Sequence, residues 1–102
     1  MIAEFTVVPL DKGPHLTEAV SPVLDIVDKS GLDYQFTAMG TIIEGDWDQI
    51  LATVKRCHEA VRQSSERVVT TLKIDDHAGR TKRIEGKVES VEKTLGRSLR
   101  QR

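Results

Sequence analysis

The sequence has little cysteine and almost no net charge. Cys57 is the single cysteine among 102 residues, so no disulfide can form within the chain and no cysteine-based metal cluster is available. Such usage is typical of the reducing cytoplasm, where we expect the protein to reside. Fifteen basic and sixteen acidic residues give a net charge of -1, which provides no overall field for nucleic acid or an anionic membrane. Any partner is therefore expected at a local site.

Long apolar segments are also missing. No apolar run approaches the length of about 20 residues that a membrane-spanning helix needs, so no membrane association is expected. The N-terminal residues MIAEFTVVPL lack a basic leader and carry Glu4, which argues against a signal peptide. With 38% hydrophobic residues, the chain is expected to form a single domain over residues 1–102. Its core would be thin, and oligomerisation would enlarge it.

Hydrophobic periodicity predicts four strands and three helices. Alternation of apolar and polar residues predicts strands over 2–9, 32–39, 40–46 and 66–76. Helical spacing of apolar residues predicts helices over 15–29, 46–65 and 84–95. Asp46 is expected to cap the second helix, and Gly96 to end the third. Pro22 is expected either to kink the first helix or to mark a restart with Ser21 as its cap.

The order β-α-β-β-α-β, followed by one more helix, is that of the ferredoxin-like folds. The expected class is α+β: a sandwich of a four-stranded antiparallel sheet with two helices on one face and an extra C-terminal helix. Both helices share a face because crossover connections are right-handed. The other face of the sheet should then be open.

The open face is expected to be rich in hydroxyl groups. Alternation predicts that Phe5, Phe36, Ile42 and Leu72 face the helices. The opposite face would then carry Glu4, Thr6, Thr37, Met39, Thr41, Thr71, Lys73 and Asp75. Such a surface suits a polar ligand or a subunit interface, although threonine is also simply a good strand former.

Three segments resemble the small thiamine-binding protein family. They are EFTVVPL, YQFTAMGTIIEGDWDQI, and ERVVTTLKIDD followed by a charged amphipathic helix. The resemblance covers nearly the whole chain in order. It implies a ferredoxin-like protomer that pairs edge to edge and assembles into a homotetramer built from dimers. It also implies cytoplasmic binding of thiamine or of its hydroxymethylpyrimidine half.

The residues around the expected bend at Met39-Gly40 suit that ligand chemically. Hydroxyls donate and accept hydrogen bonds, while a carboxylate accepts from the amino group of the pyrimidine and offsets the thiazolium charge. Glycine would let the backbone approach a flat ring, and methionine would pack its polarizable sulfur against it. The expected ligand-binding residues are Glu4, Thr6, Thr37, Met39, Gly40, Thr41 and Glu44. Glu44 has an alternative, structural role in a turn with Gly45 and Asp46.

The sequence does not offer the sets of residues that catalysis or metal binding requires. An enzyme would require a nucleophile, an acid or a base in a set, whereas His58 stands on an apolar stripe with no nucleophile as partner. Neither a catalytic residue nor a cofactor is therefore expected. Asp75, Asp76 and His77 are neighbours at a strand-to-loop junction and point in different directions, so no metal site is expected.

Two further classes share parts of the pattern. An RNA-recognition module has the same order of elements, but it needs exposed aromatic residues on central strands and a basic field. A structural or regulatory oligomer without a small-molecule ligand stays open as the alternative function. It is favoured by the apolar stripe on the last helix, formed by Ile84, Val88, Val91 and Leu95.

Overall fold

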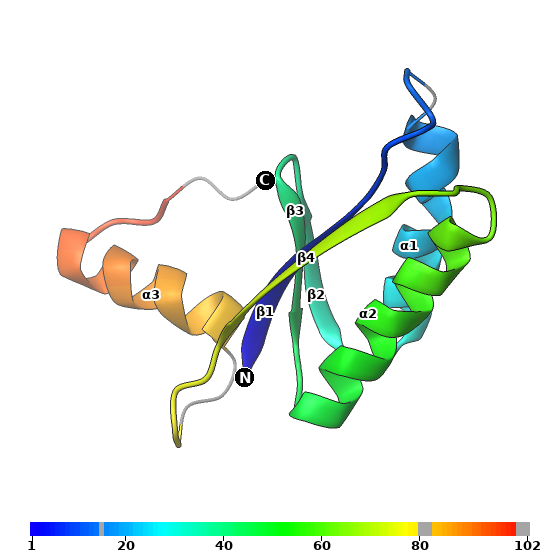
Figure 1. The fold of residues 1–102 in the computed structure, drawn as a ribbon. Helices are drawn as coiled ribbons and strands as arrows, with labels where there is room; N and C mark the ends of the chain where they lie inside the picture. Colours follow the sequence, from blue (N-terminus) through cyan, green and yellow to red (C-terminus); the bar gives the residue numbers. More distant parts are fainter. Residues whose placement is uncertain (15, 80–82, 100–102) are drawn as a thin grey trace.

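Four strands and three helices make up the computed structural model, which describes residues 1–14, 16–79 and 83–99. Their bounds are β1 (Ile2–Pro9), α1 (Leu16–Lys29), β2 (Asp33–Thr37), β3 (Gly40–Glu44), α2 (Trp47–Arg62), β4 (Val68–Asp75) and α3 (Arg83–Leu95). The strands form one antiparallel sheet in the order β2-β3-β1-β4. Helices α1 and α2 cover one face of it (Figure 1). The expected α+β, ferredoxin-like fold is confirmed.

Helix α1 is one continuous helix with Pro22 inside it. A proline has no amide hydrogen, so the carbonyl of Glu18, four residues earlier, loses its usual backbone donor. The hydroxyl of Ser21 donates to that carbonyl at 3.1 Å instead. Ser21 therefore compensates for the proline within the helix and does not cap a new one.

The two expected helix ends are confirmed. Asp46 and Gln49 form a capping box at the start of α2: the Asp46 carboxylate accepts from the Gln49 amide at 2.8 Å, and the Gln49 side chain accepts from the Asp46 amide at 3.0 Å. At the end of α3, Gly96 has φ +72° and its amide donates to the Glu92 carbonyl at 2.8 Å. Glycine adopts this left-handed conformation without a steric penalty.

The core lies between the sheet and the layer of α1 and α2. Its buried members are Ala3, Phe5, Val7, Val23, Val27, Ile43, Ile50, Val54, Cys57 and Val61. Strand β4 contributes its half-buried alternate residues, Val68, Leu72 and Ile74. The alternation expected for β1 and β4 is thus observed in the packing.

The hairpin between β2 and β3 turns one residue earlier than expected. Thr37 pairs with Gly40, so Ala38 and Met39 form the turn, in place of the predicted Met39-Gly40 bend. A shift of one residue exchanges the two faces of a strand. Thr41 and Ile43 therefore face the helices and are buried, while Ile42 lies on the open face. The predicted orientations of Ile42 and Thr41 were wrong.

Helix α3 projects away from the layer of α1 and α2 (Figure 1). It begins against the sheet, where the Ile84 amide donates to the Glu44 carboxylate at 3.3 Å. Val91 and Leu95, farther along, are about half exposed. The radius of gyration is 15.1 Å, against about 13 Å for a compact chain of this length. Much of α3 thus lies outside the core of its own subunit.

In the described part of the chain, no helix combines the length and the apolar character that a membrane crossing requires.

Candidate functional site

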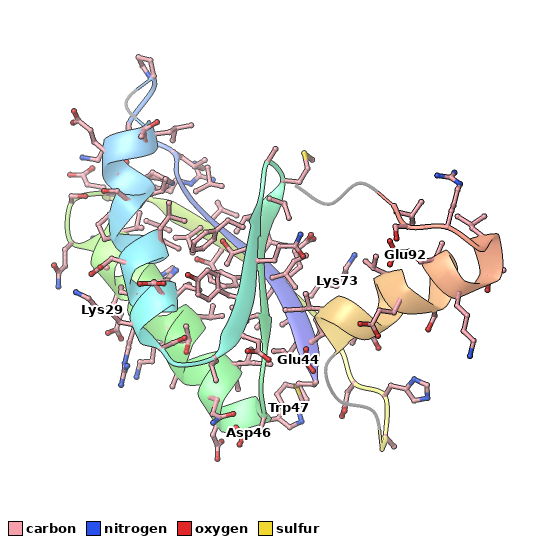
Figure 2. The ribbon with its side chains drawn as sticks, turned by 180° about the vertical axis from the view of Figure 1, so that it is seen from behind. Lys29, Glu44, Asp46, Trp47, Lys73 and Glu92 are labelled. Atoms are coloured by element: carbon pink, nitrogen blue, oxygen red, sulfur yellow. The ribbon has the colours of Figure 1, made fainter. Side chains whose placement is uncertain are left out.

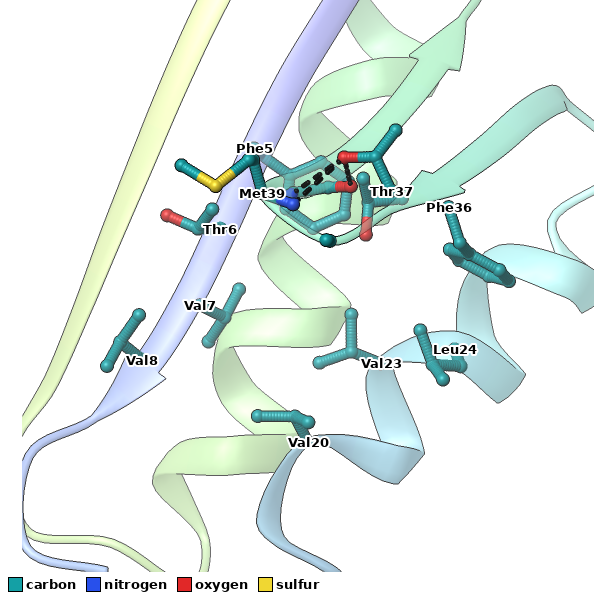
Figure 3. A pocket seen from close by; sticks show the side chains of 13 residues that line it. Phe5, Thr6, Val7, Val8, Val20, Val23, Leu24, Phe36, Thr37 and Met39 are labelled. Atoms are coloured by element: carbon teal, nitrogen blue, oxygen red, sulfur yellow. Dashed lines mark hydrogen bonds between the residues drawn. The ribbon is translucent and has the colours of Figure 1, made fainter. Parts of the chain in front are cut away.

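A cleft of about 300 Å³ opens between α1, the C-terminal half of β1 and the β2–β3 hairpin; we name it the hairpin cleft (Figure 3). Its volume lies at the lower end of the range of about 300–1,000 Å³ for small-molecule sites. Its walls are mainly apolar: Phe5, Val7, Val8, Val20, Val23, Leu24, Phe36 and Ala38. The hydroxyl residues Thr6, Thr37 and Thr41 complete it, with Met39 and Gly40 at the turn.

The cleft exists because β1 is longer than its neighbour β3. The pairing of β1 with β3 ends at Phe5 and Thr41, whereas the pairing of β1 with β4 continues to Pro9. Beyond Phe5, one edge of β1 is therefore left without a neighbouring strand among the described residues. Val20 and Leu24 of α1 stand across this gap (Figure 3).

The hydroxyl of Thr37 is fully used by the turn. It accepts from the amides of Met39 and Gly40, both at 3.1 Å, and donates to the Gly40 carbonyl at 2.9 Å (Figure 3). These bonds hold the two-residue turn, which leaves Met39 82% exposed at its tip. Thr37 thus shapes the cleft wall, and a ligand could bind its hydroxyl only in competition with the turn.

Gly40 lets the hairpin approach β1. A Cβ atom at this position would lie 3.2 Å from both the Phe5 carbonyl oxygen and the Thr6 Cγ2 atom. These distances are shorter than ordinary carbon contacts. Gly40 is thus required because two strands approach each other closely at this residue. The sequence suggested a different reason for a glycine here, close contact with the ring of a ligand.

Thr41 is the buried hydroxyl of the cleft. It is 7% exposed, and within the described residues its side chain forms no hydrogen bond. Burying a hydroxyl without a partner is unfavourable. Phe36, which pairs with Thr41 on the neighbouring strand, is 38% exposed, and its ring packs against that of Tyr34 in a tilted arrangement with ring centroids 4.8 Å apart.

The two predicted carboxylates lie outside the cleft. Glu4 borders a smaller hollow of about 120 Å³ on the open face, together with Ile42, Lys73 and Asp75. Glu44 lies at the far end of β3, where it contacts the start of α3 (Figure 2). The structure thus gathers Thr6, Thr37, Met39, Gly40 and Thr41 at one cleft. Glu4 is not part of its lining, but its Cγ atom lies against Gly40, 3.4 Å from where a Cβ atom would be, whereas Glu44 lies at the opposite end of β3.

Neither Cys57 nor His58 lines the cleft: the Cys57 thiol donates to the Val23 carbonyl of α1 at 3.9 Å, and His58 points to β4. Cys57 is fully buried, and burial raises the pKa of its thiol to about 11, so the thiol stays protonated at neutral pH. The Nδ1 atom of His58 lies 2.6 Å from the Thr70 hydroxyl. In the described chain, no group of three His, Cys, Asp or Glu side chains is placed to hold a metal ion.

Comparison with known proteins agrees with this architecture. The UPF0045 protein MJ1052 of Methanocaldococcus jannaschii is 35% identical over 91 residues, which cover 89% of this chain and 91% of that protein. A UPF0045 protein of Methanothermobacter thermautotrophicus is 40% identical over 96 residues, covering 91% of this chain and 97% of its own. Each therefore aligns with this chain over nearly its whole length.

Solved structures show the same fold. The crystal structure of MJ1052 superposes with a TM-score of 0.82 at 36% identity, covering 88% of this chain and 93% of that one. Protein TM0486 of Thermotoga maritima, provisionally assigned to thiamine biosynthesis or salvage, gives a TM-score of 0.78 at 28% identity, with coverages of 88% and 96%. The family model for the thiamine-binding protein matches residues 3–92. The chain therefore belongs to the thiamine-binding protein family.

Proposed function

We propose that the chain binds thiamine or its hydroxymethylpyrimidine moiety reversibly and catalyses no reaction. The observation that carries the proposal is the hairpin cleft, which gathers five of the seven predicted ligand residues in a member of this family. The relative from Thermotoga maritima, with its provisional place in thiamine biosynthesis or salvage, supports the same ligand class. The cleft has the mixture of apolar walls and few polar groups that small-molecule sites favour.

Two side chains support a role in binding without catalysis. Cys57 is a buried thiol whose raised pKa keeps it in the weakly nucleophilic protonated form. His58 is engaged with Thr70, a hydroxyl on the helix-covered face of the sheet. Neither lines the hairpin cleft, so neither is positioned to act on a ligand held there.

Ligand-dependent thermal unfolding tests the binding. Thiamine or hydroxymethylpyrimidine at one hundred times its dissociation constant is expected to stabilise the native protein by about 2.7 kcal/mol. For a domain of this size the midpoint should rise by several degrees, because each kcal/mol is worth roughly 4–8 °C. Differential scanning fluorimetry at increasing ligand concentration measures the shift, with choline as a cationic control that lacks both rings. No shift at millimolar ligand, with the assembly intact, would favour a structural or regulatory oligomer.

We also propose that the protein acts in the cytoplasm as a homotetramer built from dimers. Strands β2 and β4 are the edges of the sheet, and within the described chain no element of the subunit pairs with their outer sides. Such edges readily pair with a second sheet. The exposed residues Val91 and Leu95 on the projecting α3 supply an apolar stripe for subunit packing.

Lysine at Leu95 is expected to weaken the assembly, because it would place a charge in a contact formed by apolar side chains. Size-exclusion chromatography with light scattering should show smaller species for Leu95→Lys at concentrations where the wild type is tetrameric. Ser90→Lys is the matched control, since Ser90 is exposed on another side of the same helix. Equal masses for Leu95→Lys and the wild type at all concentrations would contradict this role of α3.

A further inference from the structure

One cysteine and two methionines carry the sulfur atoms of the chain, and only Met39 is largely exposed. Met39 stands in the turn of the β2–β3 hairpin and is 82% exposed. Met1 is partly buried and packs against the core. Cys57 is fully buried, and burial raises the pKa of its thiol to about 11, which keeps it in the protonated form that oxidants attack slowly. An oxidant in solution therefore reaches the Met39 thioether first.

The turn holds the backbone of Met39 and leaves its side chain unpacked. The Met39 amide donates to the Thr37 hydroxyl at 3.1 Å, and the same hydroxyl bonds to both backbone groups of Gly40. None of these bonds involves the thioether. A chemical change at the sulfur would therefore leave the hairpin folded, whereas oxidation of a core methionine places a polar group among apolar ones.

The Met39 side chain also stands at the edge of the hairpin cleft. It is one of the residues that line the cleft, and it extends from the turn on the side of Thr6 (Figure 3). A thioether is apolar and polarizable, and it packs favourably against aromatic rings. A sulfoxide in the same place carries a strongly polar S=O group. Oxidation would thus change how this edge contacts a flat ring without rearranging the cleft wall.

From these features we propose that Met39 is a redox-sensitive modification site, at which hydrogen peroxide forms methionine sulfoxide and thereby weakens binding in the hairpin cleft. The effect on binding rests on the proposed function; the oxidation itself does not. In the reaction the O–O bond of the peroxide breaks, one oxygen is transferred to the sulfur, which loses two electrons, and the rest leaves as water. Methionine sulfoxide reductases reverse the change: two thiols supply two electrons, form a disulfide and release the oxygen as water with their two protons.

Mass spectrometry after limited treatment with hydrogen peroxide locates the modification. The wild type in its native assembly should gain one oxygen atom at Met39 before any at Met1 or Cys57. Incubation with the two methionine sulfoxide reductases, one for each sulfoxide epimer, and dithiothreitol should remove it. Oxidation of Met1 or Cys57 at an equal or faster rate would overturn the inference.

The stability of the oxidised protein separates a switch from damage. Its unfolding midpoint should lie within a few degrees of that of the untreated protein, because an exposed side chain contributes little to stability. A large fall in the midpoint would assign any loss of binding to unfolding and overturn the inference.

Isothermal titration with thiamine and with hydroxymethylpyrimidine measures the consequence for binding, after catalase has removed the peroxide. The oxidised wild type should bind roughly two- to tenfold more weakly than the untreated protein, the range expected for the loss of a sulfur–ring contact. Treatment with the reductases should restore the affinity. Met39→Gln carries a polar amide at the same position and should resemble the oxidised wild type.

Met39→Leu is the matched control for oxidation elsewhere, because it retains Met1 and Cys57. This variant has an affinity of its own, and peroxide treatment should leave that affinity unchanged. Equal weakening of Met39→Leu and the wild type by peroxide would place the sensitive group at another residue and overturn the inference.

The binding results also separate this inference from the proposed function. A wild type that binds either ligand equally tightly before and after oxidation would overturn the inference and leave the proposed function standing. An untreated wild type that binds neither ligand would overturn the proposed function, and with it the regulation of binding, whichever residue the peroxide oxidises.

Discussion

Replacing Phe5 with alanine is expected to lower the free energy of unfolding by about 3–5 kcal/mol. The Phe5 side chain is 1% exposed and is among the largest fully buried groups of the protein. It belongs to the core between the sheet and the two covering helices, so its removal leaves a cavity that close-packed neighbours fill only in part. Because Phe5 also lines the hairpin cleft, the same change should weaken ligand binding.

Urea denaturation followed by circular dichroism measures the loss, and Phe36→Ala provides a matched control. Phe36 is the other phenylalanine of the chain and lines the same cleft, but it is 38% exposed on the edge strand β2. Phe36→Ala should lower the free energy of unfolding by less than half as much as Phe5→Ala, since less apolar surface is removed from the interior. Equal costs for the two variants would contradict the assignment of Phe5 to the core and of Phe36 to its rim.

The elements themselves could be predicted because their signals are local. Strand β1 and strand β4 alternate apolar and polar residues along their lengths, and that pattern directly indicates which side chains face the helices. The capping box at Asp46 and Gln49 likewise depends on residues three positions apart. Pro22 was ambiguous, because its outcome depends on whether a nearby hydroxyl can serve the carbonyl that the proline leaves without a donor.

The hairpin register could not be predicted in the same way. In FTAMGTII, Gly40 suggested a bend at Met39-Gly40, whereas the structure turns at Ala38-Met39 and holds the turn through the Thr37 hydroxyl. Gly40 is needed for a different reason, the close approach of Phe5 and Thr6 on β1. That contact joins segments more than thirty residues apart, and no local pattern encodes it.

The candidate site was therefore predicted in part. Its hydroxyl residues converge because they lie on the hairpin and on the adjacent end of β1. The carboxylates are not part of its lining. Glu4 lies two residues before Thr6 on the same face of β1, where it borders the open-face hollow beside Gly40, and Glu44 ends its strand beside α3. The apolar wall from Val20 and Leu24 was missed as part of a site, because a helical stripe of this kind ordinarily indicates core packing.

Replacing each of the two neighbouring isoleucines of β3 with alanine tests the register of this strand through the free energy of unfolding. Ile43 is fully buried among the core residues, whereas Ile42 borders the hollow on the open face. Ile43→Ala is expected to lower the free energy of unfolding by about 2–5 kcal/mol, the usual cost of truncating a buried aliphatic side chain. Ile42→Ala removes the same atoms from a half-buried position and should cost less than half as much.

Measuring the pair by urea denaturation at several protein concentrations separates the subunit from the assembly. The loss in Ile43→Ala should be the same at every concentration at which the subunits are dissociated, because its contacts lie within one chain. An additional, concentration-dependent loss in Ile42→Ala would indicate that the open face is covered in the oligomer. If Ile42→Ala proved the more costly change in dissociated subunits, the strand would have the register with Met39-Gly40 at the turn, and Thr41 would leave the cleft.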